Sequence, residues 1–232
     1  MTGNPHNDIT LRFAELLRDL ERSQPADTES ALRELTVMAA GAVPGTIAAG
    51  ITLVDRDGKV RSVASSDPVA ETVDDIQDRT KEGPCLTSAW EQHTVRVNDV
   101  AAEVRWPLFC RETLQSTPVR SAQSFQLFRH RESMGALNFY GGLPGTFDDE
   151  SLELGLTLAA HIAIAWNLLL RDDQFRSALA SRDVIGQAKG ILMERFGIDA
   201  AAAFDLLKKL SQESNTPLAA LADKVVASAG DR

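Results

Sequence analysis

No proline occurs between Asp148 and Phe196, and this stretch constrains the fold more than any other part of the sequence. A proline inside a helix removes a hydrogen bond and clashes with the preceding turn, so its absence permits one unbroken helix. The acidic residues 148–150 are placed to stabilise the start of such a helix. We therefore predict a single helix over residues 148–196, about 70 Å long.

The first half of this predicted helix is apolar on more than one side. Residues recur at seven-residue spacing along two lines, formed by Leu152, Ala159 and Trp166 and by Gly155, Ile162 and Leu169. This heptad-like spacing favours parallel dimerisation in a coiled coil, so we expect a homodimer. Packing of the same face onto a sheet of its own domain is the alternative, and both can hold on different faces. Asp172 and Asp173 weaken the pattern, which places a domain junction near Arg171.

The residues before the long helix alternate between helical and extended patterns. We expect helices over about 9–20, 28–40, from Pro68, from Pro84 to Trp90, and over 107–116, with strands at 47–54, 59–65, 95–98, 120–129 and 133–140. An Asp-Arg-Asp-Gly turn at 55–58 suits a hairpin between the first two strands. This order predicts an α+β domain with a central antiparallel sheet of about five strands, flanked by helices.

The residues after Arg171 predict a small all-α module of three helices. The first ends at Gly197, the second is capped by Asp199, and the third begins near Thr216 and Pro217. Apolar residues at three- and four-residue spacing give each helix one buried face. Gly186 and Gly190 fall inside the first helix, where each costs about 1 kcal/mol relative to alanine. Either helix packing or the close approach of another surface would explain them.

The segment from about Phe175 to Ser228 closely resembles the ANTAR domain. The match runs in order through Ser181-Arg182, Ile185-Gly186, the Ala-Lys-Gly-Ile-Leu-Met run at 188–193, Ala203-Phe204, Leu207, Ser211, Leu218, Ala222 and Val225-Val226. The resemblance implies binding to nascent RNA. It further implies that paired hairpins are stabilised against a terminator, which is transcription antitermination.

The region from about Thr28 to Trp166 resembles the GAF domains that are fused to ANTAR modules in actinobacteria. The residues that carry this likeness are Glu82-Gly83-Pro84-Cys85, Arg105-Trp106-Pro107, Val119-Arg120-Ser121, the run 135–140, Phe147 and Asp148. The resemblance implies a domain that senses a small molecule or another signal. It does not name that signal, since one fold serves many ligands.

The charge distribution limits how RNA would bind. The net charge is −9, and residues 171–232 carry nine basic and nine acidic residues, so the module is neutral. Binding should therefore be local and sensitive to salt. Lys189 and Arg182 share a helix face and can reach phosphates or a guanine edge. The other candidates are Gln187 and Gly190, for polar reach and close backbone approach, and Arg195, Lys208 and Lys209, for electrostatic attraction; a merely solvated face is the alternative.

Few residues suit catalysis or metal binding. Cys85 and Cys110 are the only cysteines, without CxxC spacing, so we expect no zinc site. A Cys85–His93 pair is the one nucleophilic arrangement in the sequence. Some GAF-fold enzymes reduce free methionine sulfoxide with cysteine thiols, so a thiol-based redox enzyme or sensor is an alternative from a different class. A ligand pocket in the α+β domain is weakly indicated by Cys85, Trp90, Trp106, Phe125 and Phe139.

Together these patterns predict a non-enzymatic regulator with an N-terminal helix at 1–27, a GAF sensor at 28–170 and an ANTAR domain at 171–232. Its expected partners are RNA, an unidentified signal and a second copy of the chain. Charged and polar residues interrupt the apolar run 152–170, so we predict no membrane span and a cytoplasmic protein. A module that binds a protein instead of RNA is a third possibility, which the neutral charge favours.

Overall fold

The computed structural model describes Glu15 and residues 28–90, 94–129 and 133–230. It divides into two compact units, Met1–Leu168 and Leu169–Arg232. The helix expected at 1–27 lies outside the described residues, except for Glu15. The same is true of His93 and of the turn at 130–132.

The first unit is built on one five-stranded antiparallel sheet, as the sequence predicts. The strands are β1 (Thr46–Asp55), β2 (Val60–Ser65), β3 (Thr94–Val97), β4 (Ser121–Arg129) and β5 (Ser133–Gly141). Their order across the sheet is β2-β1-β5-β4-β3. The last two strands of the chain, β4 and β5, are thus neighbours inside the sheet, and β5 also pairs with β1. In the register, Gly50 of β1 and Ser124 of β4 both pair with Asn138 of β5. Three neighbouring strands therefore meet around Asn138.

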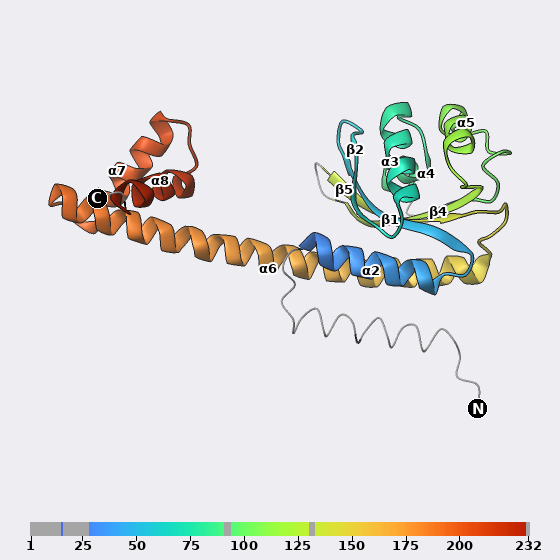
Figure 1. Ribbon diagram of the computed structural model, residues 1–232, viewed down its shortest axis with the longest axis horizontal. Coiled ribbons are helices and arrows are strands. Elements are labelled where there is room, and N and C mark those ends of the chain that lie inside the picture. Colours follow the sequence, from blue (N-terminus) through green and yellow to red (C-terminus); the bar gives the residue numbers. More distant parts are fainter. Residues whose placement is uncertain (1–14, 16–27, 91–93, 130–132, 231–232) are drawn as a thin grey trace. The chain divides into compact units, whose positions relative to one another are not determined.

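Helices cover both faces of the sheet (Figure 1). On one face lie α3 (Pro68–Thr80), α4 (Pro84–Trp90) and α5 (Pro107–Ser116), and on the other lie α2 (Thr28–Ala42) and the first part of α6 (Asp149–Phe196). Asp67 begins α3 by accepting a hydrogen bond from the Val69 amide, and Lys81 ends it in the left-handed conformation. This arrangement confirms the predicted α+β class.

The first part of α6 packs directly on its own sheet. A Cβ atom at Gly155 would lie 2.5 Å from the Phe125 ring, and Trp166 meets Phe128 edge to face at 4.9 Å between ring centroids. Ala159 and Ile162 are also buried. Most of the two heptad lines therefore belongs to the domain core, which was the alternative to a coiled-coil seam.

A different side of α6 carries apolar residues that this packing leaves exposed. Leu156, Ile164 and Leu168 each expose more than half of their surface. By length and composition alone, residues Asp149–Arg171 would suffice to cross a membrane. The burial of Leu154, Leu158 and their neighbours against the sheet accounts for much of that apolar character.

The second unit consists of the end of α6 with α7 (Ala200–Glu213) and α8 (Leu218–Gly230). The Asp199 carboxylate accepts a hydrogen bond from the Ala202 amide at 2.8 Å and so caps α7 as predicted. Five small or branched residues form the buried centre: Ala188, Leu192, Ala203, Leu207 and Ala222. Three alanines among these five keep the helices close and the core small.

Candidate functional site

A polar cluster lies inside the first unit, between the sheet and α3. Thr52 of β1, Asp74 of α3 and Asn138 of β5 are buried there. The Thr52 hydroxyl donates to the Asp74 carboxyl group, with both oxygens at 2.9 Å, and the Asn138 amide donates to the Thr52 oxygen at 2.9 Å. Buried polar groups need such partners, because each unpaired one costs about 1–3 kcal/mol.

The cluster continues through α4. The Ser124 hydroxyl of β4 donates to the Asn138 carbonyl oxygen, and the Ser88 and Ser124 oxygens are 2.8 Å apart. Gln77 of α3 accepts from the Cys85 amide at 2.9 Å, which fixes the first turn of α4. We call Thr52, Asp74, Ser88, Ser124 and Asn138 the polar core.

Burial changes the chemistry of the groups around the polar core. It raises the pKa of Asp74 from 3.8 to about 7, although hydrogen bonds from Thr52 and Ser62 act in the opposite direction. Burial also raises the pKa of Tyr140 well above its ordinary value. The Tyr140 hydroxyl is buried and has no hydrogen-bond partner among the described residues.

Both cysteines are buried, in different hydrophobic clusters. Burial is the main reason why the pKa of the Cys85 thiol is far above its ordinary value, and the nearby Asp74 raises it further. The pKa of Cys110 rises to about 11, again mainly through burial. Thiolates are the reactive form, so both side chains are poor nucleophiles in this state.

A surface depression of about 600 Å³ opens beside the turn between β1 and β2. Its wall combines both signs of charge with apolar side chains, from Arg56, Asp57, Gly58, Lys81, Glu82, Gly83, Leu86, Thr87 and Trp106. The charges are partly engaged, because the Lys81 ammonium pairs with Asp78 at 2.8 Å and donates to the Gly58 carbonyl at 3.1 Å. This depression has no dominant charge with which to select a ligand.

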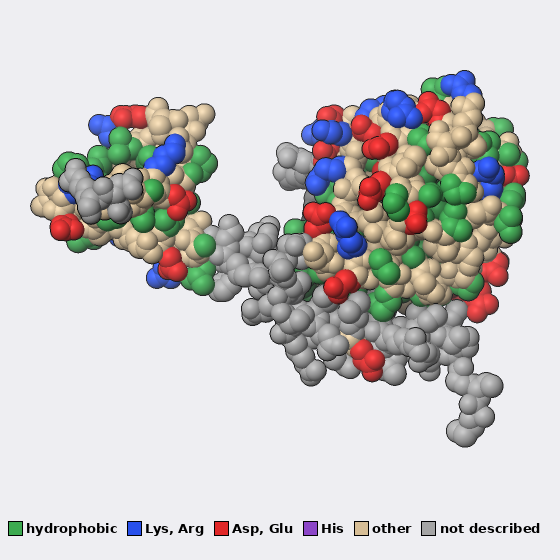
Figure 2. Space-filling model, in the orientation of Figure 1, with side chains coloured by type: hydrophobic (Ala, Val, Ile, Leu, Met, Phe, Trp, Pro, Cys, Tyr) green, Lys and Arg blue, Asp and Glu red, His purple; other side chains and the backbone are tan. Residues whose placement is uncertain are grey.

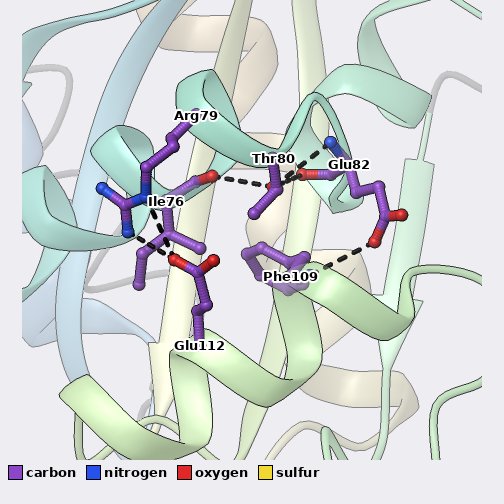
Figure 3. A network of polar contacts seen from close by, with 6 residues as sticks. All are labelled: Ile76, Arg79, Thr80, Glu82, Phe109 and Glu112. Carbon is purple, nitrogen blue, oxygen red and sulfur yellow. Dashed lines mark hydrogen bonds and ion pairs between the residues drawn. The ribbon is translucent and has the colours of Figure 1, made fainter.

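Glu82 in this wall also holds α5 in place (Figure 3). Its carboxylate accepts hydrogen bonds from the amides of Leu108 and Phe109, at 2.8 and 3.2 Å, in the first turn of α5. Arg79 of α3 pairs with Glu112 of α5 in the same view. Arg79 near the end of α3 and Glu82 just after it therefore tie α5 to the rest of the first unit.

In the second unit, several candidate side chains share one exposed face. Arg182 and Gly190 of α6 are exposed, and Lys189 lies between them with its ammonium 5.9 Å from the centre of the Phe204 ring on α7. Lys208 follows Phe204 by four residues, so the two side chains lie on the same side of α7. We call Arg182, Gly186, Lys189, Gly190, Phe204 and Lys208 the Lys189 face.

The glycines of this face have no neighbour within the described chain. A Cβ atom at Gly186 or Gly190 would meet no heavy atom within 4 Å. The candidates Gln187 and Arg195 are exposed but lie on other sides of α6, and Lys209 pairs with Glu213 at 3.9 Å. The structure thus brings together four of the seven candidates from the sequence: Arg182, Lys189, Gly190 and Lys208.

A family model for the GAF domain matches residues 26–167, which is more than half of the chain. The chain belongs to the GAF domain family. A second family model, for the ANTAR domain, matches residues 173–226. A GAF domain followed by an ANTAR domain is the architecture of a regulator in which a sensor controls an output domain. The search of curated proteins finds no match.

Solved structures agree with the GAF assignment. The chain is similar to the GAF domain of a phosphoenolpyruvate-protein phosphotransferase from Acinetobacter, with 16% identity and a TM-score of 0.54, over 75% of this chain and 99% of that one. It is also similar to free methionine-R-sulfoxide reductase from Neisseria meningitidis in complex with its substrate, with 18% identity and a TM-score of 0.54, over 74% and 96%. At these identities the likeness shows the fold alone.

The GAF domain separates the residues that the sequence grouped as a weak ligand pocket. Trp106 lines the surface depression, whereas Cys85 borders the polar core. Phe125 and Phe139 are fully buried and pack edge to face at 6.0 Å. Phe125 lies against α6, on the opposite side of the sheet from the depression. The side chain of Trp90 lies outside the described part of the structure.

The polar core of the GAF domain was not predicted from the sequence. Its five residues come from five different elements, so no local motif contains them. The signal that was present is a polar residue at an inward position of an apolar strand. Thr52 between Ile51 and Leu53 is one case, and Asn138 between Leu137 and Phe139 is another.

Proposed function

We propose that this protein is a transcription antiterminator, in which the GAF domain controls binding of the ANTAR domain to paired hairpins in nascent RNA. A signal at the GAF domain would change the geometry or dimer state of α6, which belongs to both units. Two ANTAR domains would then hold two hairpins together and keep the terminator from forming. The signal is a small molecule or another input that the fold alone does not name.

The observation that carries this proposal is the Lys189 face within the ANTAR domain. Lysine and arginine side chains there can contact phosphates, while the bare backbone at Gly186 and Gly190 allows an RNA backbone to come close. No basic residue of this face forms an ion pair among the described residues. The face is therefore available to a partner although the domain as a whole is neutral.

Binding to a synthetic RNA with two adjacent hairpins tests the proposal. Lys189→Ala should weaken binding at least tenfold, the loss of about 1.4 kcal/mol. Lys224→Ala, which removes an exposed lysine of α8 outside the face, is the matched control and should change affinity less than twofold. Equal small losses for both variants would place the binding surface elsewhere.

We also propose that the protein acts as a homodimer through the exposed side of α6. Leu156, Ile164 and Leu168 form an apolar strip there that the GAF sheet does not cover. An apolar strip along a helix is the usual basis of a parallel helix pair. A dimer would supply two ANTAR domains, as the holding of two hairpins requires.

A thiol reductase is the alternative that the fold admits. Solved reductases share the GAF fold, yet burial raises the pKa of both cysteines here and so disfavours the reactive thiolate. We therefore infer a regulator without enzymatic activity, in the cytoplasm where nascent RNA is made. Turnover of free methionine sulfoxide that is lost in Cys85→Ser would contradict this inference. A protein partner at the Lys189 face would instead appear as failure of hairpin RNA to bind at any salt concentration.

A further inference from the structure

The polar core contains a carboxyl group with no cationic partner. Asp74 is 3% exposed, and among the described residues no lysine, arginine or histidine pairs with it. The acidic groups around it are Glu71 and Asp75 on the same helix, with the Cys85 thiol from α4 and the Tyr140 hydroxyl from β5. Burying an ionised carboxylate without a cation is costly, so these surroundings favour its neutral form.

Hydrogen bonds in the polar core run in one direction toward Asp74. The Ser124 hydroxyl donates to Asn138, the Asn138 amide donates to Thr52, and the Thr52 hydroxyl donates to Asp74. Gln77 adds a longer contact to the same carboxyl group at 3.5 Å. Every neighbour in this chain is thus arranged as a donor, which suits an ionised Asp74.

At the Ser88–Ser124 end of the hydrogen-bond chain, there are fewer hydroxyl hydrogens than hydrogen-bond contacts. Ser88 and Ser124 have one hydroxyl hydrogen each, yet Ser88 contacts both the Cys85 carbonyl at 3.0 Å and Ser124 at 2.8 Å, while Ser124 also contacts Asn138. Two hydrogens therefore serve three contacts. They can point toward Asp74, or away from it toward the Cys85 carbonyl.

The reversed arrangement also satisfies every member of the chain. A protonated Asp74 would donate to Thr52, and Thr52 would donate to the carbonyl oxygen of a rotated Asn138 amide. The Asn138 amino group would then donate to Ser124, Ser124 to Ser88, and Ser88 to the Cys85 carbonyl. The oxygen and nitrogen of an amide have nearly the same shape, so this rotation needs no change in packing.

We propose that the polar core of the GAF domain is a proton-binding site, in which Asp74 takes one proton from water and the hydrogen-bond chain from Thr52 to Ser88 reverses direction. The net charge of the domain rises by one, and the new O–H bond on Asp74 is the one covalent bond of the protein that changes. The pKa of Asp74, which burial raises to about 7, places this uptake in the physiological range. The proton would be the signal of the sensor, so its effect on RNA rests on the proposed function, whereas its binding does not.

The hydrogen-bond chain of the polar core lies where a change in its direction can affect the packing of α6. Ser124, Asn138 and Thr52 belong to three adjacent strands, and residues next to them, such as Phe125, face α6 across the sheet. Gln77 contacts Asp74 and accepts from the Cys85 amide, so the first turn of α4 is linked to the same group. Binding of one proton would therefore affect the three strands β1, β5 and β4 together with the first turn of α4.

Carbon NMR of the full-length protein labelled at aspartate carboxyls tests the site between pH 4.5 and 9. One carboxyl should titrate with a midpoint about 7 in the wild type and in Asp75→Asn, its exposed neighbour on α3, but not in Asp74→Asn. If Asp74→Asn does not fold, Thr52→Val takes its place as the test. This variant removes the hydroxyl that donates to ionised Asp74, so the midpoint of the titration should move upward. Titration of every aspartate below pH 5, or a midpoint unmoved by Thr52→Val, would overturn the proposal.

Thermal unfolding gives a second readout. The pKa of Asp74 is higher in the folded protein than its ordinary value of 3.8, so the folded state binds the proton more tightly. The stabilisation is complete below pH about 4 and is lost as the pH rises through about 7. Compared with the wild type, Asp74→Asn should therefore lose less Tm between pH 6 and pH 8, while Asp75→Asn should behave as the wild type.

The two proposals fail separately. Hairpin RNA that binds equally at pH 6 and pH 8, with the titration present, would contradict proton control of the output but leave the proton site intact. Absence of RNA binding at any pH would contradict the antiterminator proposal, and the titration alone would still decide the site.

Discussion

Two glycines of α6 have opposite surroundings. A Cβ atom at Gly155, in the GAF domain, would lie 2.5 Å from the Phe125 ring, whereas one at Gly190, in the ANTAR domain, would meet nothing within 4 Å. Each glycine costs the helix about 1 kcal/mol relative to alanine. In the GAF domain this cost allows α6 to lie close to its own sheet. In the ANTAR domain no described contact offsets it, as expected for the RNA-binding face that we propose.

The same contrast holds for the polar groups of the two domains. The GAF domain buries polar groups in its interior, since Asp74 and Asn138 belong to the polar core. The ANTAR domain buries mainly small apolar residues and displays its charges, so Figure 2 shows blue, red and green side chains mixed on the face in view. A buried site suits a small input that changes packing, and an open one suits a macromolecule.

The largest effect is expected from a charge on the exposed side of α6. Leu168→Glu should weaken the proposed dimer at least a hundredfold, because dimerisation would bury an unpaired carboxylate at a cost of several kcal/mol. Light scattering at micromolar concentration should then report a monomer. Leu143→Glu, at a loop leucine that is 72% exposed, is the matched control and should leave the dimer intact. A dimer in both variants would show that this side of α6 is not the interface.

Gly155→Ala is expected to destabilise the GAF domain by about 1–3 kcal/mol, because the added methyl group overlaps a buried ring. The measurement is the Tm by calorimetry or circular dichroism. Gly41→Ala in α2 is the control, since its Cβ would meet nothing within 4 Å, and its Tm should stay the same or rise. Equal Tm values for both variants would mean that α6 does not pack on Phe125 as described.

Gly190→Ala should separate stability from binding. The ANTAR domain should gain up to about 1 kcal/mol from the better helix former. Affinity for a double-hairpin RNA should fall at the same time, because the methyl group would stand between the RNA and the backbone. Unchanged affinity in the stabilised variant would show that no partner approaches this face.

The smallest effect distinguishes two adjacent lysines. Lys208→Ala removes a charge of the Lys189 face, so the slope of log affinity against log salt should fall by about one. Lys209 pairs with Glu213 and points to another side of α7, so Lys209→Ala should leave the slope unchanged. Equal slopes for the two variants would remove Lys208 from the binding face.

The sequence predicted the elements well because their ends carry strong local signals. Pro107 begins α5, Gly58 lies in the hairpin turn, and Asp199 caps α7. These residues act on the backbone within a few positions, so their effect does not depend on the rest of the fold. The long α6 was predicted because no proline interrupts residues 148–196 and the acidic residues 148–150 favour a helix start.

The polar core and the use of the α6 faces could not be predicted in this way. Apolar spacing accounts for the burial of Val73 and Ile76 on α3, but not for the burial of Asp74 and Gln77 beside them. A buried carboxyl group depends on donors from distant strands, which local patterning does not contain. Likewise Trp166 fits a heptad, and only its contact with Phe128 shows that it belongs to the domain core.

The antiterminator proposal is tested by retention of cellular transcripts on the purified protein, at low and high salt. We expect sequencing to find leaders with two adjacent hairpins enriched at low salt, less so at high salt, and not at all with Lys189→Ala, as the proposal requires. Enrichment that persists in Lys189→Ala, or no enrichment at either salt in wild-type protein at pH 6 and pH 8, would contradict it.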